Sequence, residues 1–202
     1  MKKKLKLALV GTDSLRGKEI KNVLEKEAFP FKSIMFFDAD VAAEYSKLTE
    51  FRGDPKIIHP IDDNSLKLAD LIFLAAERKV NERIIHDTWS PGKWIIDLNE
   101  TFAGKENYPV IVAGINDNKI PYKKPSLISN PHPASIFLSH MIHLIDQNFG
   151  LKKSIAFVLQ PVSAFDVLGI NELANQSAEL LGGNSLSKTL FDEQIAFNLL
   201  SH

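Results

Sequence analysis

Apolar runs of strand length alternate with segments of helical periodicity along about the first 125 residues. The run at residues 70–76, DLIFLAA, is almost wholly apolar, as expected of a strand in a parallel sheet with both faces covered. Helical spacing of apolar residues recurs at residues 17–27 and 80–89. The other strand-like runs are residues 5–10, 33–38, 56–60, 94–98 and 109–116. This alternation predicts a Rossmann-like, doubly wound α/β domain built on a parallel sheet.

The pattern changes after the proline-marked segment at residues 120–127. A long helix is predicted from Pro133 to Phe149, and a second helix ends at Gly182 and Gly183. Strand-like runs follow each helix, at residues 152–163 and 191–202. We therefore predict a first domain over residues 1–128 and the beginning of a second, α+β domain over residues 129–202.

Composition narrows the classes of function. The 202 residues carry a net charge of -1, which offers no basic surface for nucleic acid. No apolar run approaches the roughly 20 residues of a membrane helix, so we expect a cytoplasmic protein that binds neither nucleic acid nor membrane. The chain has no cysteine, which excludes disulfides, thiolate metal ligands and a thiol nucleophile within it.

The turn after the first strand reads GTDSLRG at residues 11–17. A dinucleotide-binding turn uses three glycines, and here Gly11 and Gly17 hold the outer places while Ser14 holds the middle one. The helix that follows presents N–H groups and a positive dipole end to a phosphate. A turn without any ligand is the alternative. The predicted cofactor-binding residues are Gly11, Thr12, Asp13, Ser14, Leu15, Arg16, Gly17, Asp38 and Ala75.

Seven stretches resemble, in order, segments of the aspartate-semialdehyde dehydrogenase family. They are LALVGTDSLRGKEIKNVLEKEAFP, DLIFLAAERKV, WIIDLNETFA, YPVIVAGIN, SNPHPASI, FVLQPVSAFD and QIAFNLLSH. The resemblance implies an NAD(P)-binding Rossmann-like domain followed by an incomplete dimerisation domain, and a homodimer as the working state. Within the family, the chain looks most like a Cys-less branch known as Usg-type proteins.

The resemblance also implies that catalytic groups have been replaced. Pro133 stands where the family has its nucleophilic cysteine, and Ala103 stands where the family has a phosphate-binding arginine. Asn130 and Gln160 are retained at their family positions. We therefore expect a non-catalytic paralogue that binds a dinucleotide or dimerises. The alternative is an NAD(P)-dependent oxidoreductase that acts on a small aldehyde in amino-acid biosynthesis.

Asp38 and Asp40 follow the second strand and bear on the choice of cofactor. A carboxylate there binds ribose hydroxyls and repels a 2′-phosphate, so NAD is favoured over NADP. Asp38 could instead cap a helix predicted at residues 41–48.

Two pairs of side chains near the start of the second predicted domain resemble functional groupings. His132 and Ser135 could form a base and nucleophile pair, but a turn histidine and a helix-terminal hydroxyl are the favoured interpretation. His140 and His143 share a helical face, but no carboxylate accompanies them, so no metal site is expected.

Overall fold

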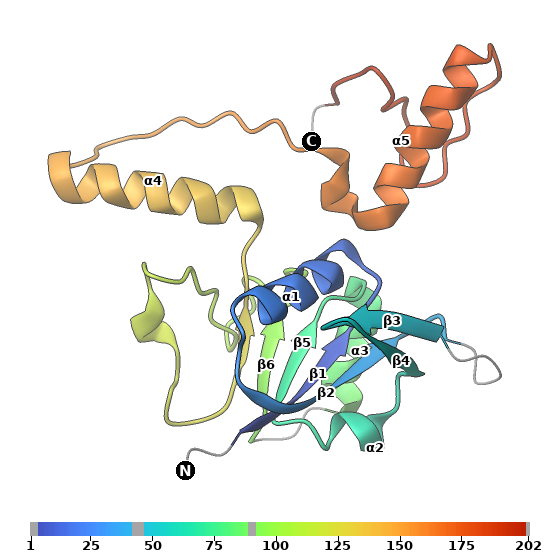
Figure 1. Cartoon of the computed structure of the whole chain (residues 1–202). Coiled ribbons are helices and arrows are strands. Elements are labelled where there is room, and N and C mark those ends of the chain that lie inside the picture. Colours follow the sequence, from blue (N-terminus) through green and yellow to red (C-terminus); the bar gives the residue numbers. More distant parts are fainter. Residues whose placement is uncertain (1–3, 42–46, 89–91, 201–202) are drawn as a thin grey trace. The chain divides into compact units, whose positions relative to one another are not determined.

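The computed structural model describes residues 4–41, 47–88 and 92–200 of the chain (Figure 1). The chain divides into two compact units, Met1–Ala156 and Phe157–His202. The predicted domain boundary between residues 128 and 129 stays a prediction.

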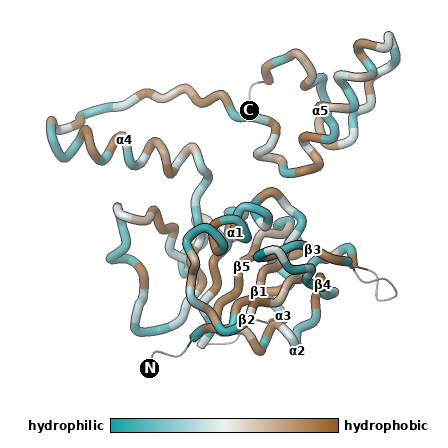
Figure 2. Tube along the Cα trace, viewed as in Figure 1, coloured by the Kyte–Doolittle hydropathy of each residue, from teal (hydrophilic) through white to brown (hydrophobic). Residues whose placement is uncertain are grey.

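The first unit is built on a seven-stranded sheet in the order β3-β4-β2-β1-β5-β6-β7. Every neighbouring pair is parallel except β3 and β4, which form an antiparallel hairpin. Figure 2 shows that β1 and β5, in the middle of the sheet, are strongly hydrophobic. The strands are β1 (Leu5–Val10), β2 (Phe31–Asp38), β3 (Lys47–Phe51), β4 (Asp54–Pro60), β5 (Leu71–Leu74), β6 (Trp94–Asp97) and β7 (Leu127–Ser129).

Helices cover both faces of this sheet. On one face, Leu24 of α1 (Leu15–Lys26) packs in a core with Leu9 and Phe36. On the other face, Leu66 of α2 (Asp63–Leu66) and Ile84 of α3 (Arg78–Thr88) pack in a core with residues of β1, β5 and β6. The predicted Rossmann-like, doubly wound fold is confirmed.

Two predictions of local structure in the first unit need correction. The expected strand at residues 109–116 is reduced to an isolated bridge between Val110 and Ser129. The Asn116 side chain takes the place of a strand partner, because it accepts from the N–H of Val112 at 2.7 Å and donates to the carbonyl of Val110 at 2.9 Å. Of the helix predicted at residues 41–48, residues 42–46 lie outside the described residues. Lys47 and Leu48 belong to β3, where pairing with β4 determines their conformation.

The long helix predicted after the Asn-Pro turn is confirmed as α4 (Pro133–Phe149). Its N-terminus suits a proline, whose missing N–H has no partner within the first turn. It ends at Gly150, which has a φ of 72°. No residue of α4 is fully buried within this chain. Large apolar side chains on it are exposed: Phe137, Met141, Leu144, Ile145 and Phe149.

The second unit contains η2 (Val162–Phe165) and α5 (Asp166–Leu181), which confirms the second predicted helix. The two strands predicted around it, at residues 152–163 and 191–202, are wrong for the residues that the structure describes. A strand needs hydrogen bonds from a neighbouring strand, and no such neighbour pairs with either described segment. Residues 201 and 202 lie outside the described part.

Side chains of α5, in place of strand pairing, hold the chain that follows it. The buried Glu172 carboxylate accepts hydrogen bonds from the N–H of Leu190 at 2.5 Å and from the N–H of Phe191 at 3.2 Å. It also accepts from both the N–H and the hydroxyl of Thr189. Burial raises the pKa of Glu172, but these hydrogen bonds outweigh burial and hold the pKa below its ordinary value.

Glu172→Ala is expected to loosen the loop at residues 187–196 and to leave the sheet of the first unit unchanged. The substitution leaves the N–H groups of Thr189, Leu190 and Phe191 without their acceptor. Amide hydrogen exchange in this loop should accelerate roughly tenfold or more, as when hydrogen bonds to a charged acceptor are lost. Glu193→Ala, at an exposed position, is the control. Equal exchange in the two variants would contradict this role of Glu172.

Candidate functional site: the carboxyl edge of the parallel sheet

The turn between β1 and α1 lies where a parallel sheet binds its ligands. The strands on either side of β1 are β2 and β5, so the chain changes direction across the sheet at this point. Gly11 has a φ of 83°, a conformation that L side chains rarely adopt. A Cβ atom at Gly11 would lie 2.4 Å from the backbone nitrogen of Ala76 and 2.5 Å from the carbonyl carbon of Ala75. Only glycine fits there, and the contact brings the predicted residues Gly11 and Ala75 together.

Gly17 provides the second close approach. A Cβ atom at Gly17 would lie 2.1 Å from the carbonyl oxygen of Gly11 and 2.9 Å from that of Thr12. The first turn of α1 is therefore packed directly on the end of β1, which is the role of the last glycine in a dinucleotide-binding turn. Leu15 and Arg16 form the beginning of α1 and are half-buried.

Ser14 at the middle glycine position is the N-cap of α1. Its φ of −61° and ψ of 159° are open to any residue, so the change from glycine causes no backbone strain. Its hydroxyl accepts a hydrogen bond from the N–H of Gly17 at 2.9 Å and donates to the carbonyl of Gly11 at 2.7 Å. The hydroxyl proton of Ser14 is therefore used within the turn.

The end of β2 is tied to this turn. The N–H groups of Gly11 and Thr12 both donate to the carbonyl of Phe37, at 3.0 and 3.3 Å. The buried hydroxyl of Thr12 lies 3.1 Å from the same oxygen. One step further, the N–H of Asp13 donates to the Asp38 carboxylate at 3.1 Å. The predicted cofactor-binding residues that follow β1 are thus joined by hydrogen bonds to the end of β2. We call this part of the sheet edge, formed by residues 11–17 and the end of β2, the cofactor corner.

Asp38 is a buried carboxylate, with 9% of its surface exposed. Burial raises the pKa of Asp38 to about 6, opposed by the hydrogen bond from Asp13, and the nearby charge of Asp13 raises it further. The predicted capping of a helix at residues 41–48 falls partly outside the described residues. In the hydrogen bond described for Asp38, its carboxylate instead accepts from the N–H of Asp13.

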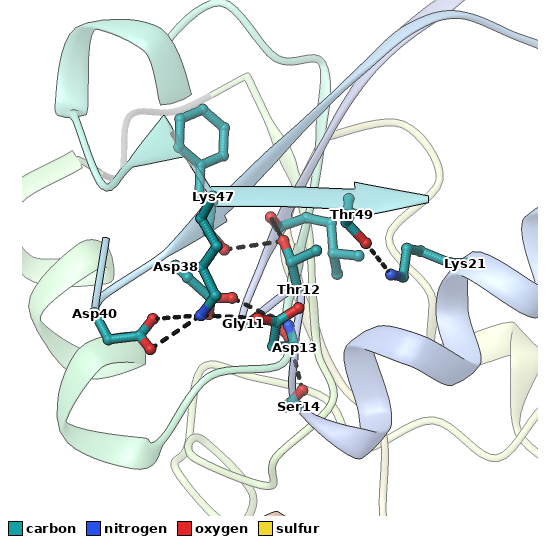
Figure 3. A network of polar contacts seen from close by, with 11 residues as sticks. Gly11, Thr12, Asp13, Ser14, Lys21, Asp38, Asp40, Lys47 and Thr49 are labelled. Atoms are coloured by element: carbon teal, nitrogen blue, oxygen red, sulfur yellow. Dashed lines mark hydrogen bonds and ion pairs between the residues drawn. The ribbon is translucent and has the colours of Figure 1, made fainter. Parts of the chain in front are cut away.

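Lys47 belongs to the same corner and was missed by sequence reasoning, which placed it in a helix. Its ammonium lies 2.8 Å from Oδ2 of Asp13 and 3.0 Å from Oδ2 of Asp40 (Figure 3). The hydrogen bonds that the ammonium donates to Asp13 and Asp40 raise the pKa of Lys47 above its ordinary range. The strand pattern of KLTEF at residues 47–51 was the available signal, because a hairpin with β4 brings the start of β3 back to this edge.

Two side-chain amides bind the backbone of the chain segment that follows β5. The carbonyl of Ala76 accepts from Nδ2 of Asn81 at 2.9 Å and from Nδ2 of Asn99 at 3.0 Å. Asn81 is fully buried and also donates to the hydroxyl of Thr101 at 3.1 Å. Glu77 and Arg78, which follow Ala76 in the chain, are exposed. This edge is therefore held by amide hydrogen bonds between α3 and the chain after β6.

Asp97 joins the ends of β6 and β7. Its buried carboxylate accepts from the hydroxyl of Ser129 at 3.0 Å and from the N–H of Phe102 at 2.9 Å. Its carbonyl accepts from the N–H of Asn130 at 2.8 Å. These bonds fix the retained Asn130 immediately before the N-terminus of α4.

The N-terminus of α4 carries no nucleophile at its first position. Pro133 is exposed, and His132 before it caps the helix, with Nδ1 accepting from the N–H of Ala134 at 3.2 Å. An accepting Nδ1 carries no proton, so this ring nitrogen is used for capping. Ser135 is exposed, and the structure describes no hydrogen bond between it and His132. The favoured interpretation of a helix-terminal serine and a turn histidine agrees with this geometry.

Gln160, the other retained family residue, is exposed and belongs to the second compact unit. Its catalytic role stays a prediction. Among the described residues, no group of three or more histidine, cysteine, aspartate or glutamate side chains is arranged to hold a metal ion. Within the same residues, no helix is long and apolar enough to cross a membrane.

The residues of the first turn fit a dinucleotide. A Cβ at Gly11 or Gly17 would collide with backbone atoms, so only glycine lets the turn pack this closely and lets α1 begin directly behind it. Asp38 lies at the end of β2, the position from which a carboxylate binds ribose hydroxyls. The individual cofactor contacts of residues 11–17, Asp38 and Ala75 stay predictions.

Comparison with known proteins agrees with this assignment. Residues 6–122, more than half of the chain, match the family described as semialdehyde dehydrogenase, NAD binding domain. Aspartate-semialdehyde dehydrogenase of Rickettsia bellii is 28% identical over 205 residues, which cover 100% of this chain and 60% of the relative. The enzyme of the same name from Prochlorococcus marinus is 23% identical, over 98% of this chain and 57% of its own. The chain thus spans less than two thirds of the length of these relatives.

Solved structures show the same fold. The chain matches aspartate semialdehyde dehydrogenase II of Vibrio cholerae, complexed with ASA, with a TM-score of 0.82 at 22% identity. A probable aspartate-semialdehyde dehydrogenase from Pseudomonas aeruginosa matches with a TM-score of 0.77 at 24% identity. Each alignment covers 97% of this chain and 58% of the other. The likeness confirms the fold predicted from the sequence.

Asp38→Asn is expected to stabilise the protein at neutral pH. The raised pKa means that the folded state favours the neutral carboxyl, so the stability that Asp38 contributes is present below pH 3.8 and lost as the pH rises through about 6. At pH 7 to 8 the variant should gain up to about 3 kcal/mol in free energy of unfolding, which corresponds to this rise in pKa.

Urea unfolding between pH 4 and 8 measures the effect. The difference between the variant and the parent should shrink as the pH falls toward 4. Asp54→Asn removes an exposed carboxylate and should show no such dependence on pH. A difference for Asp38→Asn that stays constant with pH would contradict the raised pKa.

Proposed function

Because the chain belongs to the semialdehyde dehydrogenase family through its NAD-binding domain, we propose that it is a dinucleotide-binding protein without thiol chemistry. The observation that carries the proposal is the buried Asp38 carboxylate at the end of β2, which accepts a hydrogen bond from the N–H of Asp13 in the turn at residues 11–17. The family assignment supports a nicotinamide dinucleotide as the ligand class. In this proposal the chain keeps the cofactor-binding site but lacks the catalytic step at the N-terminus of α4.

In this proposal the chain's own residues bind the two halves of the cofactor. The turn at residues 11–17 and the N-terminus of α1 face the pyrophosphate, where the helix dipole favours negative charge. Asp38 binds the hydroxyls of the adenosine ribose, and Ala75 lies beside Gly11 under the turn. A bound nicotinamide would supply hydride transfer.

NAD is the proposed form of the cofactor. Asp13, Asp38 and Asp40 lie at this corner, and the ammonium of Lys47 is already paired with two of these carboxylates, so a 2′-phosphate would meet negative charge. A 2′-hydroxyl instead donates a hydrogen bond to a carboxylate. The corner thus favours NAD by electrostatics and by hydrogen bonding.

The absence of thiol chemistry is proposed from α4. A helix N-terminus lowers the pKa of a cysteine placed there, which makes it a nucleophilic thiolate. Pro133 has no nucleophilic atom, and the chain has no cysteine. A Cys-less paralogue of Usg type, acting as a binding protein, accounts for a retained turn and a replaced nucleophile.

A second candidate is an NAD(P)-dependent oxidoreductase that acts on a small aldehyde without a thioester. The bonds that join Asp97, Ser129 and Asn130 favour it, because they hold the loop before α4 in a defined place. This candidate requires consumption of reduced cofactor in the presence of a small aldehyde. The first candidate requires binding without turnover.

We also propose that the chain forms a homodimer through residues after 128, where the second predicted domain begins. The support is the exposed apolar surface of α4, which includes Phe137, Leu144 and Phe149. A second copy of the chain is the proposed cover for this surface, and sedimentation of the purified protein measures it.

The purified protein is expected to bind NADH saturably and more tightly than NADPH. Isothermal titration calorimetry is the suitable measurement. Quenching of Trp94 fluorescence is a poor alternative, because Trp94 begins β6, away from the carboxyl edge of the sheet. Asp38→Ala should weaken the binding of NADH, whereas Asp54→Ala, at an exposed position on β4, should not. Absence of binding at about 1 mM of either cofactor would exclude the dinucleotide function.

Pro133→Cys is expected to create a reactive thiol but no dehydrogenase activity. The new thiol would stand exposed at the first position of α4, where it should react with iodoacetamide. Oxidation of aspartate semialdehyde should still fail, because Ala103 occupies the position of the family's phosphate-binding arginine. Pro133→Ala is the control for the helix. Phosphate-dependent formation of NADH by the cysteine variant would show that the site is intact and would contradict the proposal.

A further inference from the structure

Lys47 reaches the cofactor corner through the topology of the sheet. Strand β4 runs parallel to β2, with Asp38 opposite Pro60, and β3 runs antiparallel to β4, with Lys47 opposite Ile58. The first residue of β3 therefore lies at the edge where β2 and β4 end. Figure 3 shows the Lys47 side chain between Asp40 on one side and the turn at Asp13 on the other.

The ammonium of Lys47 is shared between two carboxylates. It lies 2.8 Å from Oδ2 of Asp13, and it donates to both oxygens of Asp40, at 3.1 and 3.0 Å. Asp13 is part of the turn at residues 11–17, and its own N–H donates to the Asp38 carboxylate. Lys47 is thus connected to the position of the pyrophosphate and to the position of the ribose.

The ion pairs of Lys47 contribute little to the stability of the fold. The side chains of Lys47, Asp13 and Asp40 are 33%, 40% and 74% exposed. Ion pairs with this exposure contribute little to folding stability, because water screens them and the side chains lose freedom. The position of the charges beside the ribose-binding carboxylate matters more for a charged ligand than for folding.

We propose that Lys47 is a specificity-determining residue for the dinucleotide, and that Asp13 and Asp40 set the preference by occupying its ammonium. This inference rests on the proposed dinucleotide function. While both carboxylates hold Lys47, its ammonium is not available to a 2′-phosphate, and Asp38 accepts a 2′-hydroxyl. Loss of the charge on Asp40 frees part of the ammonium for a 2′-phosphate, which a lysine binds as a point charge.

The same geometry gives Lys47 a second effect on binding. A carboxylate in the phosphate turn repels the pyrophosphate, and the ammonium of Lys47 offsets that charge at Asp13. Removal of Lys47 should therefore weaken both cofactors, whereas removal of Asp40 should mainly change the ratio between them. The two substitutions have different signatures, which separates a specificity role from a general loss of binding.

The experiment compares the dissociation constants of NADH and NADPH, measured by calorimetry at one low salt concentration, in four forms of the full chain. Asp40→Asn should shift the ratio toward NADPH by roughly threefold to fivefold, the range expected for exposed charge pairs. The double variant Asp40→Asn with Lys47→Met should lose this shift. Asp54→Asn is the matched control. Asp54 pairs with Lys56 at 3.1 Å, and its side chain is 70% exposed, similar to the 74% exposure of the Asp40 side chain.

Each outcome decides a separate claim. A shift in Asp40→Asn that requires Lys47 supports the inference. Binding of NADH by the parent with equal ratios in Asp40→Asn and Asp54→Asn would overturn the inference and leave the dinucleotide function standing. A shift that persists without Lys47 would assign the preference to the carboxylate alone and would also overturn the inference. Failure of the parent to bind either cofactor would overturn both.

Discussion

The close approach of backbone at Gly11 and Gly17 is the constraint on which the first unit depends. Gly11 lies against the chain after β5, and Gly17 lies against the end of β1, each closer than any Cβ would permit. These contacts fix where α1 begins and hold the turn against Phe37 at the end of β2. Because three strands and one helix meet there, the binding corner and the packing of the sheet have the same origin. Ser14 shows the limit of the constraint, since its backbone is extended and accepts a side chain.

Sequence patterns predicted those elements whose determinants are local. Helix α4 follows from its apolar periodicity and from Pro133 at its start, and β5 follows from an uninterrupted apolar run. The strands expected at residues 109–116 and 152–163 failed because a strand depends on a distant neighbour that its own residues do not specify. Lys47 was missed for the same reason, since the register of β3 with β4, and not its own surroundings in sequence, places it at the site.

The two halves of the candidate site have been changed to different degrees. At the N-terminus of α4, a proline is compatible with the helix, and His132 supplies the cap, so the fold is maintained without a nucleophile. At the turn before α1, the outer glycines are kept where the packing allows no other residue. Packing alone therefore explains the glycines, and it does not require a ligand. A bound ligand is indicated only by residues that packing does not need.

Asp38 is such a residue. Its burial raises the pKa of the carboxyl to about 6, so its negative charge at neutral pH destabilises the fold. Its described hydrogen bond, from the N–H of Asp13, would be accepted equally well by a neutral amide oxygen. Neither packing nor that hydrogen bond requires a carboxylate, whereas two donating ribose hydroxyls do favour one. A charge that lowers stability at the end of β2, beside the turn at residues 11–17, therefore supports the proposed binding of a ligand with a free ribose.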